Sequence, residues 1–128
     1  MPKRKTTYLS KKVKFMQDMV AVISLRSEDK ISIDSLTEDL KSALDYPIDA
    51  DLMVRNLQHL RRLGLASLDW QKRTIRREGL LKEYVEKNVV RSEMWSNLAE
   101  DWRRINSAIE NKRGNVNPEY QELLQRME

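Results

Sequence analysis

Residues 49–77, DADLMVRNLQHLRRLGLASLDWQKRTIRR, contain the pattern that decides the fold of this chain. Asp49 stands where an N-cap belongs, because its carboxylate can accept hydrogen bonds from the N–H groups of a first helical turn. Gly64 can end the helix in the left-handed conformation at low cost. Between them, apolar residues recur on one helical face, namely Met53, Leu57 and Leu60. The stretch predicts a capped amphipathic helix with a glycine stop.

After the glycine the pattern changes to the two-residue period of a strand. Ala66, Leu68 and Trp70 alternate with polar residues, residues 71–73 suit a turn, and residues 74–77 suit a return strand. We therefore expect a β-hairpin with a basic tip. Because Trp70 alternates with Leu68, we expect its side chain in the core, and stacking on a sugar or base is the alternative.

An apolar residue, leucines four and seven positions later, a Gly-Leu pair and a hairpin resemble the third helix and wing of the winged helix-turn-helix superfamily. The residues that carry the resemblance are Met53, Leu57, Leu60, Gly64 and Leu65. With the preceding helix and the following hairpin it covers residues 10–80. In that family the third helix enters the DNA major groove and the wing touches the backbone or minor groove. The resemblance implies the same arrangement here.

Composition limits the fold and the chemistry of the chain. Its 128 residues suffice for one domain with extensions, and only three glycines and three prolines favour a mainly helical protein. We expect a mainly α fold with a small β-hairpin wing. The absence of cysteine excludes disulfides and thiolate metal sites and fits a reducing compartment. Without a long apolar run or a hydrophobic signal region, the sequence predicts a soluble cytoplasmic protein that is not a membrane partner.

Charge is distributed unevenly along the chain, although the net charge is only +4. Residues 1–14 hold six Lys or Arg and no acid, and residues 55–77 hold seven against one Asp. Between them, residues 28–51 hold eight acids against two lysines. Clustered basic residues attract nucleic acid, so the arrangement of the basic segments in space bears directly on function.

The N-terminal residues 1–9 are expected to form a basic, flexible arm. In the winged-helix interpretation, Lys3, Arg4 and Lys5 contact phosphates or the minor groove. The alternative is a tail that only increases solubility.

Two helices and a short strand are expected before the third helix. Ser10 can cap a first helix that runs to about Ser27 and whose broad apolar stripe favours core packing over a membrane surface. Residues 30–33 alternate as a short strand that fits beside the wing. Ser32 or Asp34 can cap a second helix, which ends before Pro47.

Residues 50–62 are the candidate recognition helix. Arg, Asn and His side chains can read base edges, so we expect Arg55, Asn56 and His59 to contact bases. Arg61 and Arg62 are expected on phosphates. The alternative is that this face of the helix contacts only solvent.

Two features of the same helix favour protein contact instead. Asp49 and Asp51 place carboxylates at the end that usually meets the bases, where they would repel phosphates. Leu52 and Val54 are apolar residues on the side expected to face solvent.

The wing supplies further candidate phosphate contacts. Lys72 and Arg73 are expected at the hairpin tip and Arg76 on the return strand. Since successive strand residues point to opposite faces, Arg76 and Arg77 cannot both share the side of the tip.

Residues 81–128 are expected to form a helical extension for dimerisation or partner binding. A heptad seam steps by three and four residues through Trp95, Leu98, Trp102, Ile105 and Ile109. This seam either folds back on the first helix or pairs with a second subunit, and we favour a homodimer. Asn117-Pro118 then starts a last short helix with an apolar face.

No catalytic constellation is visible in the sequence. One histidine, no cysteine and no glycine-rich loop leave neither a metal cluster nor a phosphate cradle, so we expect no enzyme activity, metal or cofactor. The sequence therefore predicts a small transcriptional regulator that binds specific double-stranded DNA. The alternative is a winged-helix protein-interaction module, such as an adaptor, assembly subunit or inhibitor, with a protein partner on the C-terminal helices.

Overall fold

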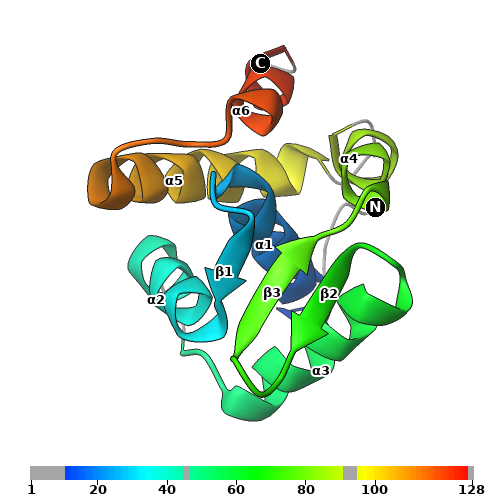
Figure 1. Ribbon diagram of the computed structural model, residues 1–128. Coiled ribbons are helices and arrows are strands. Elements are labelled where there is room, and N and C mark those ends of the chain that lie inside the picture. The colour runs from blue at the N-terminus through cyan, green and yellow to red at the C-terminus, as the bar shows by residue number, and fades with distance from the viewer. Residues whose placement is uncertain (1–10, 45–46, 91–94, 127–128) are drawn as a thin grey trace, which may run out of the picture.

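A computed structural model describes residues 11–44, 47–90 and 95–126 of the chain (Figure 1). Helices dominate these ranges, and three short strands form one antiparallel sheet, which confirms the mainly α fold class with a small β-hairpin. In chain order the elements are α1 (Lys11–Leu25), β1 (Lys30–Ser32), α2 (Ile33–Ala43), α3 (Ala50–Arg62), β2 (Ala66–Asp69), β3 (Thr74–Arg77), α4 (Leu80–Tyr84), the π-helix η1 (Val85–Val90), α5 (Trp95–Arg113) and α6 (Pro118–Arg126).

The sheet has the strand order β1-β3-β2, with both pairings antiparallel. Ile31 on β1 lies opposite Ile75 on β3, which lies opposite Leu68 on β2, and these residues form the inner face. The short strand predicted at residues 30–33 is confirmed, and it pairs with the hairpin. It ends at Ser32 because the Ser32 hydroxyl accepts a first-turn N–H of α2 and so caps that helix.

Helix α3 begins and ends as the sequence predicts. Asp49 Oδ1 accepts the Asp51 N–H at 2.8 Å, and this capping bond starts the helix. Gly64 has a φ of 77°, the left-handed conformation that stops it. The buried face of the helix consists of Met53, Leu57 and Leu60.

Helix α1 is the central element of the core. It ends at Leu25, two residues before the expected end, and the predicted Ser10 cap lies outside the described residues. Its apolar side chains are buried on more than one face, which agrees with core packing: Phe15, Met19, Val20, Ala21, Val22, Ile23 and Leu25. A helix that is apolar nearly all round needs partners on several sides.

Helix α5 supplies one of those partners and corrects the predicted dimer interface. Figure 1 shows α5, drawn yellow to orange, crossing α1, and α5 also contacts α2. Four residues of the heptad seam are buried inside the chain, namely Leu98, Trp102, Ile105 and Ile109. Trp95 is half-buried and packs edge-to-face on Trp102, with ring centroids 6.0 Å apart. The seam folds back because α1 and α2 leave an apolar face that the hairpin and α3 do not cover.

A buried ionic cluster joins α1, α2 and α5. Arg26, which follows α1 and is 3% exposed, bonds Asp39 of α2 at 2.9 Å. Asp39, itself 2% exposed, also accepts Arg113 Nη2 from the end of α5 at 2.9 Å. Glu28 binds the same Arg26 guanidinium through both oxygens, and these hydrogen bonds lower the pKa of the Glu28 carboxyl to about 2. The end of α5 is thus tied to α2 by the partly buried Arg113–Asp39 ion pair.

Helix α6 closes the core beside α1. Asn117 Oδ1 accepts the Glu119 N–H at 3.1 Å, so the predicted Asn-Pro helix start is confirmed. The Asn117 N–H donates to the Leu25 carbonyl at 2.8 Å and ties this start to the end of α1. The apolar face predicted for the helix is buried at Tyr120, Leu123 and Leu124, and Met127 lies outside the described residues.

Burial of Tyr120 predicts a loss of stability at alkaline pH. Burial, and secondarily the charge of Glu119, raises the pKa of the Tyr120 phenol to about 12 from 10.0. Its stabilising contribution is complete below pH 10 and falls as the pH rises through the window between these values, because the unfolded chain loses the proton first. Urea unfolding of wild type and Tyr120→Phe across this window should show a steeper decline for wild type. Parallel declines would contradict the prediction.

Candidate functional site

The exposed face of α3 brings together the residues predicted to contact bases. Arg55 and His59 are exposed one turn apart, and Asn56, next to Arg55 in the sequence, is half-buried. These three residues and Arg62 line one shallow hollow of about 220 Å³, with Leu52 at its apolar end. The hollow therefore presents two guanidinium groups, an imidazole and an amide on a single helical face.

Hydrogen bonding leaves most of this polar set available. The Asn56 amide nitrogen donates to the Leu52 carbonyl within the helix at 2.8 Å, which fixes the side chain along the helix. The Asn56 side-chain oxygen makes no hydrogen bond within the described ranges and can act as an acceptor. Arg55, His59 and Arg62 make no ion pair with another residue in the described ranges. Such unpaired donors on a rigid helix can bind an external acceptor without first breaking an internal bond.

Charge along α3 is polarised. The Asp49 carboxylate is engaged in capping, and Asp51 is exposed in the first turn, whereas His59, Arg61 and Arg62 lie in the last turn. Acids at the N-terminus and cations at the C-terminus both complement the helix dipole. The acidic first turn thus has a structural reason, and the basic end is the part of α3 that suits anions.

The predicted phosphate contacts are spread over several places. Arg61 is exposed on α3 but does not line the hollow of Arg55 and Arg62. Lys72 is exposed in the hairpin turn, where its N–H donates to Asp69 Oδ1 at 3.1 Å. The three residues predicted as contacts in the N-terminal arm, Lys3, Arg4 and Lys5, lie outside the described residues.

Arg73 is held by an internal partner. Its guanidinium pairs with Asp34 at the start of α2 at 2.9 Å, with both side chains largely exposed. Its carbonyl accepts the Ile33 N–H at 2.9 Å, and its φ of 54° places the residue in the left-handed region. Arg73 therefore helps to anchor the hairpin tip on α2, and its charge is already partly compensated.

Arg76 and Arg77 point to opposite faces of the sheet, as strand alternation requires. Arg77 points inward and donates to the carbonyls of Ile23 and Arg26 at 2.9 and 2.8 Å, so its role is to bind the end of α1. Arg76 is exposed on the outer face. Of these two arginines, only Arg76 is placed to contact a ligand.

The prediction that Trp70 belongs to the core is wrong. β2 ends at Asp69, so Trp70 begins the turn and is 43% exposed. Beside it, Val54 of α3 is 40% exposed. Both side chains line a groove of about 490 Å³ between α2, α3 and the hairpin, together with Ile33, Ile48, Met53 and Arg73. This groove lies on a different side of α3 from the Arg55 hollow.

Sequence reasoning missed the polar residues that share the outer sheet face with Arg76. Lys30 lies opposite Arg76 on β1, Ser67 lies opposite it on β2, and Thr74 is two residues away on β3. Alternation within each strand could have assigned these side chains to the polar face. Their meeting depends on the register between strands that are far apart in sequence, and no local pattern fixes that register.

Comparisons with protein-family models, with curated proteins and with solved structures gave no match. Within the described ranges, no helix has the length and apolarity required to cross a bilayer. The same ranges contain no group of three or more His, Asp or Glu side chains arranged to hold a metal ion.

Proposed function

We propose that this chain is a winged helix-turn-helix protein that binds double-stranded DNA as a small transcriptional regulator. Support for the fold comes from the order helix, strand, helix, helix and hairpin over α1 to β3, with the first strand paired to the hairpin. That order is the one the sequence resemblance implies. In this arrangement α3 is the recognition helix and the β2–β3 hairpin is the wing.

One observation carries the DNA-binding proposal: Arg55, Asn56, His59 and Arg62 line a single exposed face of α3. The major groove admits an α-helix, and Arg and Asn side chains make paired hydrogen bonds to guanine and adenine edges. Arg55 and His59 are exposed and centrally placed, so they would meet base edges. Arg62, one turn further toward the basic end, would meet a phosphate.

The hairpin would supply flanking contacts to the DNA backbone. Lys72 at the turn is exposed, and Arg73 can exchange Asp34 for a phosphate oxygen, because an exposed ion pair is worth little. Phosphate contacts of this kind position the protein without reading sequence. Since the α5 seam is buried in the chain, a homodimer on a two-fold DNA site would need a different contact surface.

Binding selected from a random duplex library tests the proposal. Wild type should enrich a defined sequence, and its affinity should fall steeply as salt rises. Arg55→Ala should weaken binding to that sequence by about five- to 150-fold, since a paired base contact is worth about 1–3 kcal/mol. The matched control is Arg104→Ala, an equal charge change at an exposed arginine of α5 that pairs with Glu100.

The hairpin is tested in the same assay. A Lys72→Ala/Arg73→Ala/Arg76→Ala variant should bind with a shallower salt dependence, because fewer counterions are released from the DNA. Failure of wild type to bind any duplex at low salt would overturn the DNA-binding proposal. Equal losses of DNA affinity in Arg55→Ala and Arg104→Ala would show that α3 does not contact the bases.

A protein-interaction module is the second candidate, and the groove beside Trp70 and Val54 favours it. Two large apolar side chains that are 43% and 40% exposed on the rim of one groove are typical of a surface that receives apolar side chains. The Val54→Ser/Trp70→Ser variant separates the two functions. It should retain the DNA affinity of wild type if α3 reads DNA through the Arg55 face.

A further inference from the structure

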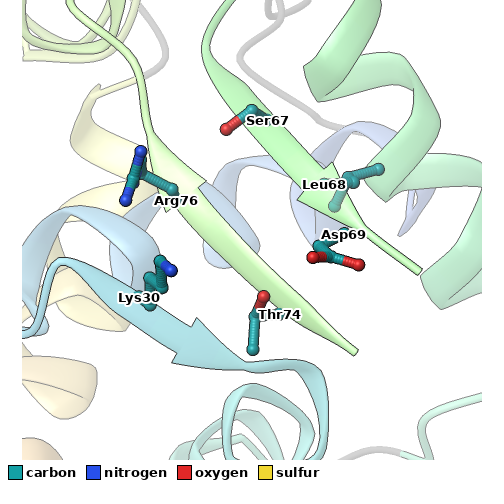
Figure 2. Close-up of a pocket in the computed structure, with 6 residues that line it drawn as sticks. All are labelled: Lys30, Ser67, Leu68, Asp69, Thr74 and Arg76. Atoms are coloured by element: carbon teal, nitrogen blue, oxygen red, sulfur yellow. The ribbon is translucent and has the colours of Figure 1, made fainter. Parts of the chain in front are cut away.

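The outer face of the three-stranded sheet carries a polar hollow separate from α3. Figure 2 shows its lining side chains on β1, β2 and β3. The hollow has a volume of about 180 Å³ and is lined on the outer face by Lys30, Ser67, Asp69, Thr74 and Arg76; Leu68, whose side chain belongs to the inner face, also borders it. Roughly six water molecules would fill that volume in the liquid, so a phosphate group with its substituents fits.

Two like charges meet across the strands of this face. Lys30 on β1 is the direct register partner of Arg76 on β3, and both side chains are exposed. Like charges directly opposite each other in a sheet are destabilising. Neither cation has a side-chain partner among the residues that the structure describes, whereas Arg73 on the same hairpin pairs with Asp34. The pair therefore resembles a site that an external anion would complete.

Hydroxyl groups flank the two cations. Ser67 on β2 is the other register partner of Arg76, and Thr74 is on the same face of β3 two residues before it. Both side chains are half-buried, and neither hydroxyl has a hydrogen-bond partner within the described ranges. Lysine, arginine and hydroxyl donors around one hollow match the several acceptor oxygens of a phosphate group.

Asp69 limits the charge of the anion that this hollow accepts. It lines the hollow next to Thr74, and its Oδ1 accepts the N–H of Lys72 in the turn. Two cations and one carboxylate leave a single net positive charge. That balance matches a singly charged phosphodiester better than a doubly charged phosphate monoester.

We propose that the outer sheet face binds a phosphodiester group, through Lys30 and Arg76 with Ser67 and Thr74 as hydroxyl donors. A nucleic-acid backbone is the polymer that offers this group repeatedly. The site deepens the proposed function, because it adds a backbone contact on a surface other than α3. A small phosphodiester can occupy it whether or not α3 binds DNA, so the two proposals fail separately.

NMR titration of the full chain with dimethyl phosphate, a minimal phosphodiester, tests the site. At constant ionic strength set by chloride, backbone amide signals of β1, β2 and β3 should shift saturably. Lys30→Gln/Arg76→Gln should weaken this binding about a hundredfold or more, since it removes two charge-assisted bonds that are each worth more than about tenfold in affinity. The matched control is Lys87→Gln/Arg104→Gln, which removes the same charge from helical surface pairs with Glu83 and Glu100.

Single variants keep the test decisive if the double variant folds poorly. Ser67→Ala should weaken dimethyl phosphate binding without changing charge. Asp69→Asn should strengthen binding of inorganic phosphate dianion relative to dimethyl phosphate. The proposal is overturned by non-saturable shifts in wild type, or by equal binding in the Lys30/Arg76 and control doubles.

A measurement of duplex DNA binding distinguishes the contribution of this site from that of α3. If the backbone occupies the hollow, the Lys30/Arg76 double variant should reduce the logarithmic salt slope of duplex binding by about 2. An unchanged slope would overturn the nucleic-acid assignment. Saturable dimethyl phosphate binding in a protein that fails to bind any duplex would leave the phosphodiester site supported and the proposed function rejected.

Discussion

Replacing Asp39 by asparagine is expected to lower the free energy of unfolding by about 3 kcal/mol. The Asp39 carboxylate is 2% exposed and bonds two arginines, Arg26 from the end of α1 and Arg113 from the end of α5. Removing its charge leaves both guanidinium groups without their shared counter-ion. Losses of this kind reach about 5 kcal/mol in fully buried pairs. The lower figure applies here because Arg26 retains Glu28 and because the Arg113 side chain is 22% exposed.

Urea unfolding followed by circular dichroism measures this loss. The matched control is Glu38→Gln, one residue earlier in α2, whose carboxylate is 64% exposed and lies 3.4 Å from Lys112. That variant should change the free energy of unfolding by less than about 1 kcal/mol, as exposed ion pairs do. Similar small losses in both variants would show that the Asp39 cluster does not hold α5 against α1 and α2.

The parts of the fold that follow from local rules could be predicted from the sequence. The Asp49 cap, the Gly64 stop and the Asn117 helix start depend only on residues within one or two turns. The hairpin followed from two short alternating runs around a turn. The α3 candidate residues were found for the same reason, because helical spacing alone puts Arg55, Asn56, His59 and Arg62 on neighbouring positions.

Features that depend on long-range packing were missed or mistaken. β2 ends one residue earlier than the alternation indicates, so Trp70 lies on the rim of a groove instead of in the core. Lys30 meets Arg76 only through the β1–β3 register, although 46 residues separate them in the numbering. The cluster around Asp39 likewise brings together residues from three parts of the chain. In the sequence alone, each of these residues is indistinguishable from a charged residue on the surface.

The heptad seam shows the same limit most clearly. Its spacing is equally compatible with a second subunit and with the chain's own α1 and α2. The feature that distinguishes these two arrangements lies in α1, whose apolar stripe is too broad for one packing partner. A helix buried on nearly every side requires more cover than α2, α3 and a short hairpin provide, and α5 and α6 supply it.

Trp102→Ala is therefore expected to lower the free energy of unfolding by about 3–5 kcal/mol, at every protein concentration. Trp102 is 1% exposed and lies among buried residues of the same chain, so truncation leaves a large cavity in one molecule. Its indole N–H is buried with no acceptor among the described residues, so Trp102→Phe should cost much less. The matched control is Trp70→Ala, which removes a tryptophan that is 43% exposed and should cost under about 1 kcal/mol.

Unfolding midpoints in urea, measured over a hundredfold range of protein concentration, distinguish a seam buried within one chain from a seam buried between two subunits. A wild-type midpoint that rises with concentration, and loses that dependence in Trp102→Ala, would return Trp102 to a subunit interface, because only association makes stability depend on concentration.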